Sequence, residues 1–274
     1  MLRLMLMRLS SSHLFVFTLA LVLAGCGSGK THRDGPGSAN IPNMPGDAVP
    51  RPEARSKYGN GRDLGNGGQY EVFNKTYTVM GSSANYQERG VASWYGKKFH
   101  GNLTSNREVY DMYEMTAAHK TLPLPTYVHV RNLRNDKRIV VRVNDRGPFV
   151  NNRIIDLSYA AAMKLDMISD GTSLVEVTAI NFDRPIKKVV SSPSVESSQI
   201  YVQVGAFGDR SNAERLLAML SQSGVSTALI YEDTSSSMTL FHVRVGPVMN
   251  VTQYDVLVEE LAGLGVTTTY LITK

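Results

Sequence analysis

One hydrophobic pattern is repeated in the last quarter of the chain. Apolar and polar residues alternate over 200–204, and the same alternation returns over 241–245. Apolar residues at helical spacing follow each run, at 213–220 and 254–261, and further apolar runs follow these at 225–231 and 266–272. Period two predicts strands and a period near 3.6 predicts helices. The order predicts an α+β, ferredoxin-like βαββαβ domain over 199–274, in which two helices cover one face of an antiparallel sheet.

The alternation also predicts which side chains line the open face of this sheet. If the apolar residues of the two runs pack under the helices, then Tyr201, Gln203, His242 and Arg244 point away from them. Such a face is either a polar and aromatic platform for a ligand or a merely solvated surface. The spacing of Ser211 and Glu214 fits a capping box, which predicts the start of the first helix there.

The middle of the chain has mainly strand patterns. Apolar β-branched runs at 127–130, 138–143 and 174–180 predict strands, and the Ala-rich stretch 158–165 predicts the one good helix. Strands with an isolated short helix suggest a compact, mostly β barrel. We place this domain at 70–182, with a core at 89–182, and leave open whether residues 70–88 add a strand.

Two stretches have almost no apolar pattern and separate the predicted domains. Residues 26–69 are rich in Gly, Pro and Asn, and residues 183–198 are rich in Lys, Ser and Pro. Such compositions cannot bury a core, so we interpret the first as a disordered tether and the second as a linker.

The N-terminus has the pattern of a secretory signal over residues 1–25. Arg3 and Arg8 precede an apolar run at 14–23, which is too short to span a membrane and ends in small residues before Cys26. Cys26 is the only cysteine of the chain, which excludes an internal disulfide framework and a thiolate metal cluster. Its remaining roles are a buried thiol, a nucleophile or an attachment point.

The net charge of the chain depends on whether the predicted signal is removed. The 274-residue chain has a net charge of +5 and a pI near 9.2, which would suit a nucleic-acid partner in the cytosol. Loss of residues 1–25 lowers the net charge to +3, and export removes most of that argument. We therefore expect no nucleic-acid partner.

The barrel segment holds the residues that could do chemistry. Its ionisable candidates are Glu108, Asp111, Glu114, His119, Asp136, Asp145, Asp156 and Asp166. Turn formation explains Asp136, and helix capping explains Asp156. Asp145 instead ends an apolar strand, which would hold a catalytic carboxylate rigidly at a barrel rim. The alternative is a structural carboxylate that bonds the following turn and pairs with Arg146. The histidines lack HExxH spacing, so we expect neither a metal nor a cofactor.

Several short motifs of this segment resemble the double-psi β-barrel of the rare lipoprotein A family. They are GVASWYG at 90–96, FHG at 99–101, TS at 104–105, EVY at 108–110, MTAAH at 115–119, TLP at 121–123, VNDRGP at 143–148 and IDLS at 155–158. The resemblance implies a lytic transglycosylase, a lyase that acts on peptidoglycan at the division septum. It assigns Asp145 as general acid and base, Glu108 as a second acidic residue and His119 as a supporting site residue.

Two further resemblances complete this layout. YVQVGAF at 201–207 and VRVGP at 243–247 are similar to the SPOR domain, which implies binding to septal glycan stripped of peptides, with Gln203, Phe207, Ser211 and Arg244 as contacts. Residues 23–26 (LAGC) resemble a lipobox, which implies cleavage before Cys26 and its acylation, including a palmitate. Gly27 in place of Asp implies an anchor in the outer membrane, facing the periplasm. We expect a monomer.

The implied reaction sets requirements on the site. It breaks the β-1,4 bond between MurNAc and GlcNAc and closes a 1,6-anhydro ring, so an acid must hold a proton near neutral pH. Desolvation, or repulsion from Glu108, would raise the pKa of Asp145 accordingly. Arg146 would oppose this, so we expect it to point outward.

The roles of three aromatic residues and of the loop before Glu108 stay open at this point. Trp94, Tyr95 and Phe99 would form a sugar platform or pack in the core. Asn106 and Arg107 depart from the family motif, in which a small residue and Gly are usual, and this departure could move the loop that holds Glu108. The alternative function is a non-catalytic lipoprotein that binds peptidoglycan and bridges the outer membrane and the septal wall.

Overall fold

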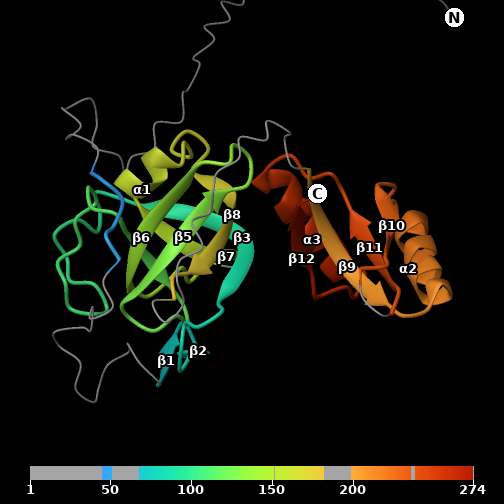
Figure 1. The fold of residues 1–274 in the computed structure, drawn as a ribbon, viewed down its shortest axis with the longest axis horizontal. Coiled ribbons are helices and arrows are strands. Elements are labelled where there is room, and N and C mark those ends of the chain that lie inside the picture. The colour runs from blue at the N-terminus through green and yellow to red at the C-terminus, as the bar shows by residue number, and fades with distance from the viewer. Residues whose placement is uncertain (1–44, 51–67, 151, 182–198, 236–237, 274) are drawn as a thin grey trace, which may run out of the picture. The chain divides into compact units, whose positions relative to one another are not determined.

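The computed structural model describes residues 45–50, 68–150, 152–181, 199–235 and 238–273, drawn in colour in Figure 1. The predicted signal, the lipobox with Cys26, most of the tether and the linker at 183–198 lie outside the described residues. Among the residues that are described, no helix is long and apolar enough to cross a membrane.

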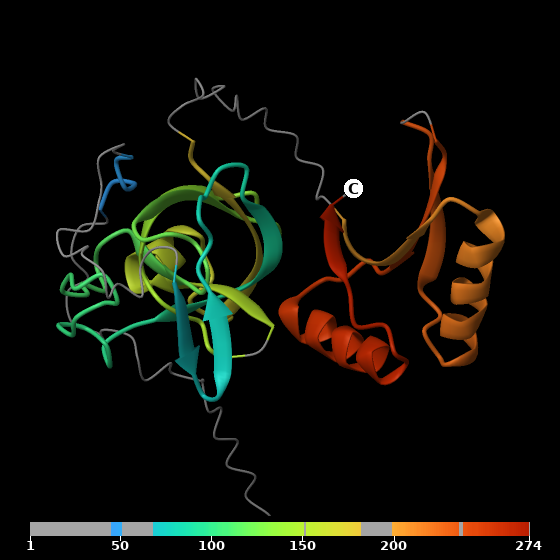
Figure 2. The ribbon, with the colours of Figure 1, turned by 90° about the horizontal axis from the view of Figure 1, so that it is seen from below.

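Six strands form a closed barrel, and they pair in the order β3, β7, β4, β6, β5, β8. They are β3 (Gln87–Tyr95), β4 (Thr116–His119), β5 (Thr126–Asn132), β6 (Arg138–Asp145), β7 (Arg153–Ser158) and β8 (Thr172–Ala179). The pairs β3–β7 and β4–β6 are parallel and the others are antiparallel. This is a double-psi β-barrel, which confirms the predicted fold class, and Figures 1 and 2 show it from two sides.

Alternating β-branched residues fill the barrel interior. Val128, Val141 and Val177 are all fully buried, each on a different strand. The helix α1 (Tyr159–Lys164) adds three buried alanines to this core. Ser158 is the N-cap of α1 and accepts a hydrogen bond from the amide of Ala161 at 3.2 Å. Capping therefore does not explain Asp156, and that interpretation was wrong.

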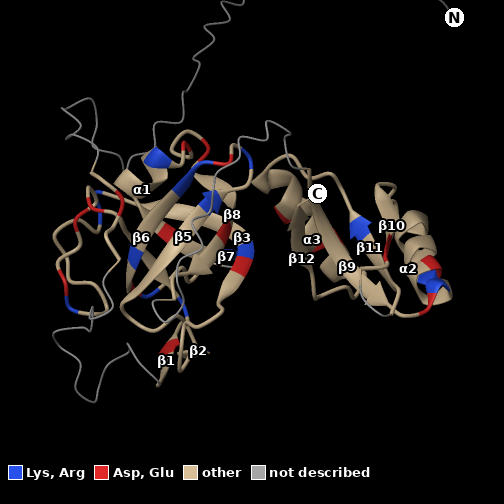
Figure 3. Cartoon of the chain, viewed as in Figure 1, with Lys and Arg blue, Asp and Glu red and all other residues tan. Residues whose placement is uncertain are grey.

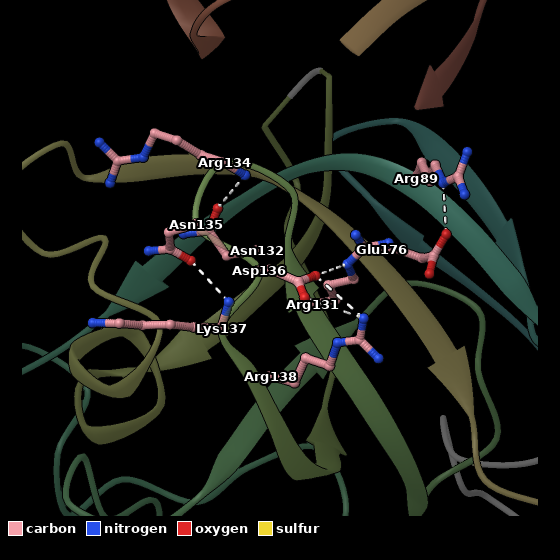
Figure 4. Close-up of polar contacts among 9 residues, drawn as sticks. All are labelled: Arg89, Arg131, Asn132, Arg134, Asn135, Asp136, Lys137, Arg138 and Glu176. Carbon is pink, nitrogen blue, oxygen red and sulfur yellow. Dashed lines mark hydrogen bonds and ion pairs between the residues drawn. The ribbon is translucent and has the colours of Figure 1, made fainter. Parts of the chain in front are cut away.

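Polar side chains fold the turn between β5 and β6 (Figure 4). The amides of Arg134 and Lys137 donate to the side chains of Asn132 and Asn135, at 2.9 and 3.0 Å. Asp136 has a left-handed φ of 57°, and Arg131 and Arg138 pair with its carboxylate. Asp136 therefore lies in a turn, as the sequence predicts.

Residues 69–78 form a separate hairpin and add no strand to the barrel. Its strands β1 (Gln69–Val72) and β2 (Lys75–Thr78) pair only with each other among the described strands. The hydroxyl of Tyr70 donates to the carbonyl of Lys120 at 2.7 Å, and the amide of Met80 donates to the carbonyl of Thr121 at 2.7 Å. These bonds fix the hairpin to the turn after β4.

Part of the predicted tether lies against the barrel. Within residues 45–50, the amide of Ala48 donates to the carbonyl of Val140 on β6 at 3.0 Å. Asp47 accepts from the amide of Val140 at 3.1 Å and pairs with Lys164 at 2.8 Å.

The C-terminal domain confirms the predicted βαββαβ order. It consists of β9 (Ile200–Phe207), α2 (Arg210–Gln222), β10 (Ala228–Asp233), β11 (Leu240–Val245), α3 (Val251–Gly263) and β12 (Tyr270–Thr273). The antiparallel sheet has the order β10, β11, β9, β12, and both helices contribute to one core with Val202 and Val243. Asp209 caps α2 and accepts from the amide of Ser211 at 2.8 Å, so the predicted cap at Ser211 was wrong.

Charges of both signs are spread over the strands and loops of the barrel in Figure 3. Several are neutralised locally, as in the pair of Arg89 and Glu176 at 2.6 Å. Lys and Arg are therefore interspersed with Asp and Glu along the barrel in that view.

Candidate active site

Asp145 lies at the end of β6, where the loop at 104–106 holds one edge of its carboxylate. The amide and the hydroxyl of Ser105 donate to Oδ1 at 2.8 and 2.7 Å, and the amide of Arg146 donates to the same oxygen at 2.8 Å. All three of these hydrogen bonds reach Oδ1. They fix the carboxyl group of Asp145 at the end of the strand.

Asp156 is a second carboxyl group beside Asp145. Ala118 on β4 pairs with Asp145 on one side and with Asp156 on the other, so the two acids flank the same residue. The hydroxyl of Ser93 donates to Oδ1 of Asp156 and accepts from Nη1 of Arg153 at 2.9 Å.

The surroundings of Asp156 raise the pKa of its carboxyl group. Burial raises the pKa of Asp156 and the charge of Asp145 raises it further, while the bond from Ser93 and the charges of Arg153 and Lys120 oppose the shift without cancelling it. Asp156 therefore keeps a proton to a higher pH than an ordinary aspartate. A signal for Asp156 exists in the sequence, because its carboxyl group interrupts the apolar run of β7.

Glu108 is an ion-paired carboxylate. Arg142 Nη1 donates to its Oε2, and Asn144 Nδ2 donates to the same oxygen at 2.9 Å. Burial alone would raise the pKa of Glu108, but these bonds and the charge of Arg142 hold it below its usual value. Glu108 is thus ionised at neutral pH. The charge of Asp145 raises the pKa of Asp156 and not that of Glu108.

The loop before Glu108 accommodates the unusual Asn106 and Arg107. Arg107 adopts a φ of 68°, the left-handed conformation in which glycine is preferred. The amide of Glu108 donates to Thr104 Oγ1 at 3.2 Å and to Asn106 Oδ1 at 3.4 Å, so polar side chains close the turn. The departure from the motif therefore strains the backbone at Arg107. It does not displace Glu108 from Arg142.

His119 organises the turn after β4. Its Nδ1 accepts from the amides of Thr121 and Leu122 at 3.1 and 3.0 Å, which places the ring proton on Nε2, 2.8 Å from the hydroxyl of Tyr86. That hydroxyl donates in turn to Glu88 at 2.6 Å. With both ring nitrogens occupied, His119 acts on the site through the backbone.

Arg146 does not point outward as expected. Its side chain is buried, with 7 % exposure, and its Nη1 donates to the carbonyls of His119 and Leu122 at 3.1 and 2.6 Å. The guanidinium carbon lies 5.7 Å from the centre of the Tyr70 ring. The expectation was wrong because carbonyls of the turn after β4 and an aromatic ring replace water around this cation.

The predicted aromatic platform is divided between core and surface. Tyr95 stacks on Tyr110 at 4.2 Å between ring centres, and Trp94 meets Tyr159 edge-on at 5.6 Å. Phe99 is 47 % exposed. Trp94 and Tyr95 are therefore partly buried and pack against the core, while Phe99 lies at the surface. The described residues include no group of three or more His, Cys, Asp or Glu placed to hold a metal ion.

The open face of the C-terminal sheet carries a row of side chains across four strands. Arg244 pairs in register with Gln203 and Leu229, and Gln203 pairs with Tyr270. Arg244 Nε donates to Gln203 Oε1 at 3.4 Å, and its guanidinium lies 4.2 Å from the centre of the Tyr231 ring. Gln203 and Arg244 thus come together as the predicted parity requires. Tyr231 and Tyr270 were missed because they lie on the outer strands.

Phe207 and Ser211 lie apart from this row. A bulge between Val243 and Arg244 shifts the register of β11 against β9. A Cβ on Gly205 would come within 2.7 Å of the Phe207 ring and 3.0 Å of Leu216 on α2, so Phe207 packs on the helix side of the strand. Ser211 lies in the first turn of α2.

Comparison with known proteins places both domains. Residues 87–177 match the family model described as lytic transglycolase, and residues 196–269 match the SPOR domain. The site therefore belongs to a lytic transglycosylase domain, as the sequence predicts.

Similarity to whole proteins extends over most of the chain. An endolytic peptidoglycan transglycosylase RlpA of Vibrio cholerae is 39 % identical, covering 93 % of this chain and 94 % of its own. The protein of the same name from Pseudomonas aeruginosa strain UCBPP-PA14 is 36 % identical, covering 80 % and 78 %. The chain belongs to the RlpA family, which confirms the resemblance found in its motifs.

Proposed function

We propose that the protein is a lipid-anchored endolytic transglycosylase that cleaves MurNAc–GlcNAc β-1,4 bonds of peptidoglycan to 1,6-anhydro products at the division septum. Family membership supports the reaction class, and the observation that carries the proposal is the pair of carboxyl groups, Asp145 and Asp156, on either side of Ala118. Their surroundings differ, as those of an acid and a base must.

The two carboxyl groups divide the proton transfers in this proposal. Protonated Asp156 donates to the glycosidic oxygen, the bond from MurNAc C1 to that oxygen breaks, and GlcNAc leaves with a hydroxyl group. Asp145, as the general base, takes the proton of the MurNAc C6 hydroxyl, whose oxygen bonds to C1. Water is not consumed, and transfer of the proton from Asp145 to Asp156 restores the starting state. In the simpler version expected from the motif, Asp145 does both steps alone.

Mass spectrometry of digested sacculi tests the reaction. We expect 1,6-anhydro muropeptides from the wild type and from Asp166→Asn, a control at an exposed, ion-paired surface aspartate. Asp145→Asn and Asp156→Asn should each lower the yield by about 100-fold or more, since each removes a proton-transfer group. Full activity of Asp156→Asn would favour Asp145 acting alone. Full activity of Asp145→Asn would refute the mechanism, and no product from the wild type would favour the binding-only lipoprotein.

Binding to glycan without peptides is assigned to the C-terminal domain. Gln203 and Arg244 supply hydrogen bonds on its sheet face, and the family contacts Phe207 and Ser211 lie at and after the end of β9. We expect Arg244→Ala to reduce retention of the protein on peptide-free strands, while Glu259→Ala, on exposed α3 surface, leaves it unchanged. Equal retention on peptide-free and peptide-bearing glycan would contradict this assignment.

Anchoring and location are proposed from the N-terminal motif. Labelled palmitate should be incorporated into the wild type and not into Cys26→Ser. A fluorescent fusion of the wild type should fractionate with the outer membrane and concentrate at the septum. Labelling of Cys26→Ser to the level of the wild type would remove the lipid anchor from the proposal.

A further inference from the structure

The hairpin of β1 and β2 ends in an exposed aromatic residue that its fold does not require. Phe73 and Asn74 form the turn with φ values of 51° and 58°, and 86 % of Phe73 is exposed. A tight turn of this kind favours Asn and Gly, and a bulky side chain in the left-handed conformation is costly. Phe73 gains little from burial in return, and such an arrangement is typical of a functional position.

An aromatic strip leads from Phe73 to the carboxyl pair. The ring of Phe73 meets Phe149 edge-on at 6.5 Å between centres, and Tyr77 supports Phe149 at 5.6 Å. A Cβ on Gly147 would lie 4.0 Å from Cε2 of Phe149 and 3.8 Å from Oδ2 of Asp156. The Phe149 ring and the Asp156 carboxyl group therefore border the same point.

The hairpin is also held firmly in this place. Tyr70 stacks on Tyr77 at 5.2 Å, and its hydroxyl bonds the carbonyl of Lys120. The Arg146 guanidinium lies over the Tyr70 ring, one residue from Asp145. The hairpin is therefore bonded to the turn that follows β4, the strand that pairs with both acid-bearing strands.

We propose that Phe149 and Phe73 form an accessory glycan subsite, on which sugar rings beyond the cleaved bond pack their C–H faces. The identity of the ligand as a glycan rests on the proposed function. Flat apolar rings continuous with the carboxyl pair suit an extended polysaccharide, which must continue past the bond that is cut. The residues beside the tip, Glu71 and Lys75, have opposite charges and do not attract an anionic surface.

Kinetics on substrates of different length tests the subsite in the full-length protein. Phe73→Ala should lower kcat/KM on long peptide-free glycan strands about three- to tenfold and have a smaller effect on short oligosaccharides that only span the cleaved bond. Thr76→Ala is the matched control, because Thr76 is exposed on the hairpin and alternates with inward Tyr77. An equal loss on both substrates, or none on either, would overturn the proposal.

A binding measurement separates this proposal from the catalytic one. Phe73→Trp in an Asp145→Asn background places an indole at the tip, and Trp94 is the only other tryptophan of the chain. Long peptide-free strands should change its emission saturably, relative to the parent with Phe73. This outcome supports the subsite even if the wild type makes no anhydro product. A response to phospholipid vesicles and not to glycan would overturn the proposal.

Discussion

Acidification tests the role of His119 as a neutral, structural residue. In the folded protein its Nδ1 accepts two amide hydrogens, from Thr121 and Leu122, so a proton on Nδ1 would face two donors. Burial, together with the charges of Arg146 and Lys120, lowers the pKa of His119 from 6.5 to about 3. In the unfolded chain the ring titrates normally.

The dependence of stability on pH follows from the difference between the pKa values of His119 in the folded and unfolded states. The unfolded state takes up the proton first, so stability is fully present above pH 6.5 and falls as the pH drops toward the folded pKa of about 3. Each pH unit in this window costs about 1.4 kcal/mol. The loss at a pH of about 4.5 is therefore about 2 to 3 kcal/mol of unfolding free energy.

Urea unfolding of the wild type and His119→Gln, near neutral pH and at a pH of about 4.5, measures this loss of unfolding free energy. Glutamine can accept from the turn and donate to Tyr86, but it does not titrate. The wild type should lose about 2 to 3 kcal/mol more than the variant on acidification. His129→Gln, at a half-buried histidine whose pKa burial also lowers, is the control and should remove a smaller part of the loss. Equal losses in wild type and His119→Gln would refute the assignment of a buried neutral ring.

Three further predictions concern stability, each measured by chemical unfolding. Arg107→Gly should stabilise the protein by about 1 kcal/mol, because its left-handed φ costs glycine less, and Arg107→Ala should give no gain. Arg142→Met should cost about 1 to 3 kcal/mol at neutral pH by leaving Glu108 without its cation. Its effect should shrink as the pH falls through the lowered pKa of Glu108, and an undiminished loss at acid pH would contradict the ion pair. Ser158→Ala should cost about 1 kcal/mol by removing the cap on the amide of Ala161, whereas an unchanged midpoint would show that the cap contributes nothing.

Periodicity was sufficient for the fold of the C-terminal domain because each of its strands buries one face. The alternation at 200–204 placed Gln203 and Arg244 on the open face correctly. The alternation does not continue past the bulge, where Phe207 turns to the helix side. A bulge is a matter of pairing between strands, so the sequence of β9 alone does not reveal it.

In the barrel, neighbours in sequence gave the wrong prediction for Asp156 and Arg146, because contacts with distant strands and turns determine where these side chains lie. Asp156 precedes a helix and resembles a cap, but pairing with β4 brings it beside Asp145. Arg146 was expected in solvent because sequence gives no sign of the two carbonyls that receive it. The charged groups of this site are arranged by strands distant in sequence, which propensity and spacing do not describe.

The pairing of β3 has a consequence for the order in which the barrel can form. β3 bonds only β7 and β8 among the described strands, and both are made long after it. During synthesis β3 therefore has both edges free, and a free edge invites aggregation. Contacts so distant along the chain also slow folding. The barrel can therefore close only after residue 179 has been synthesised.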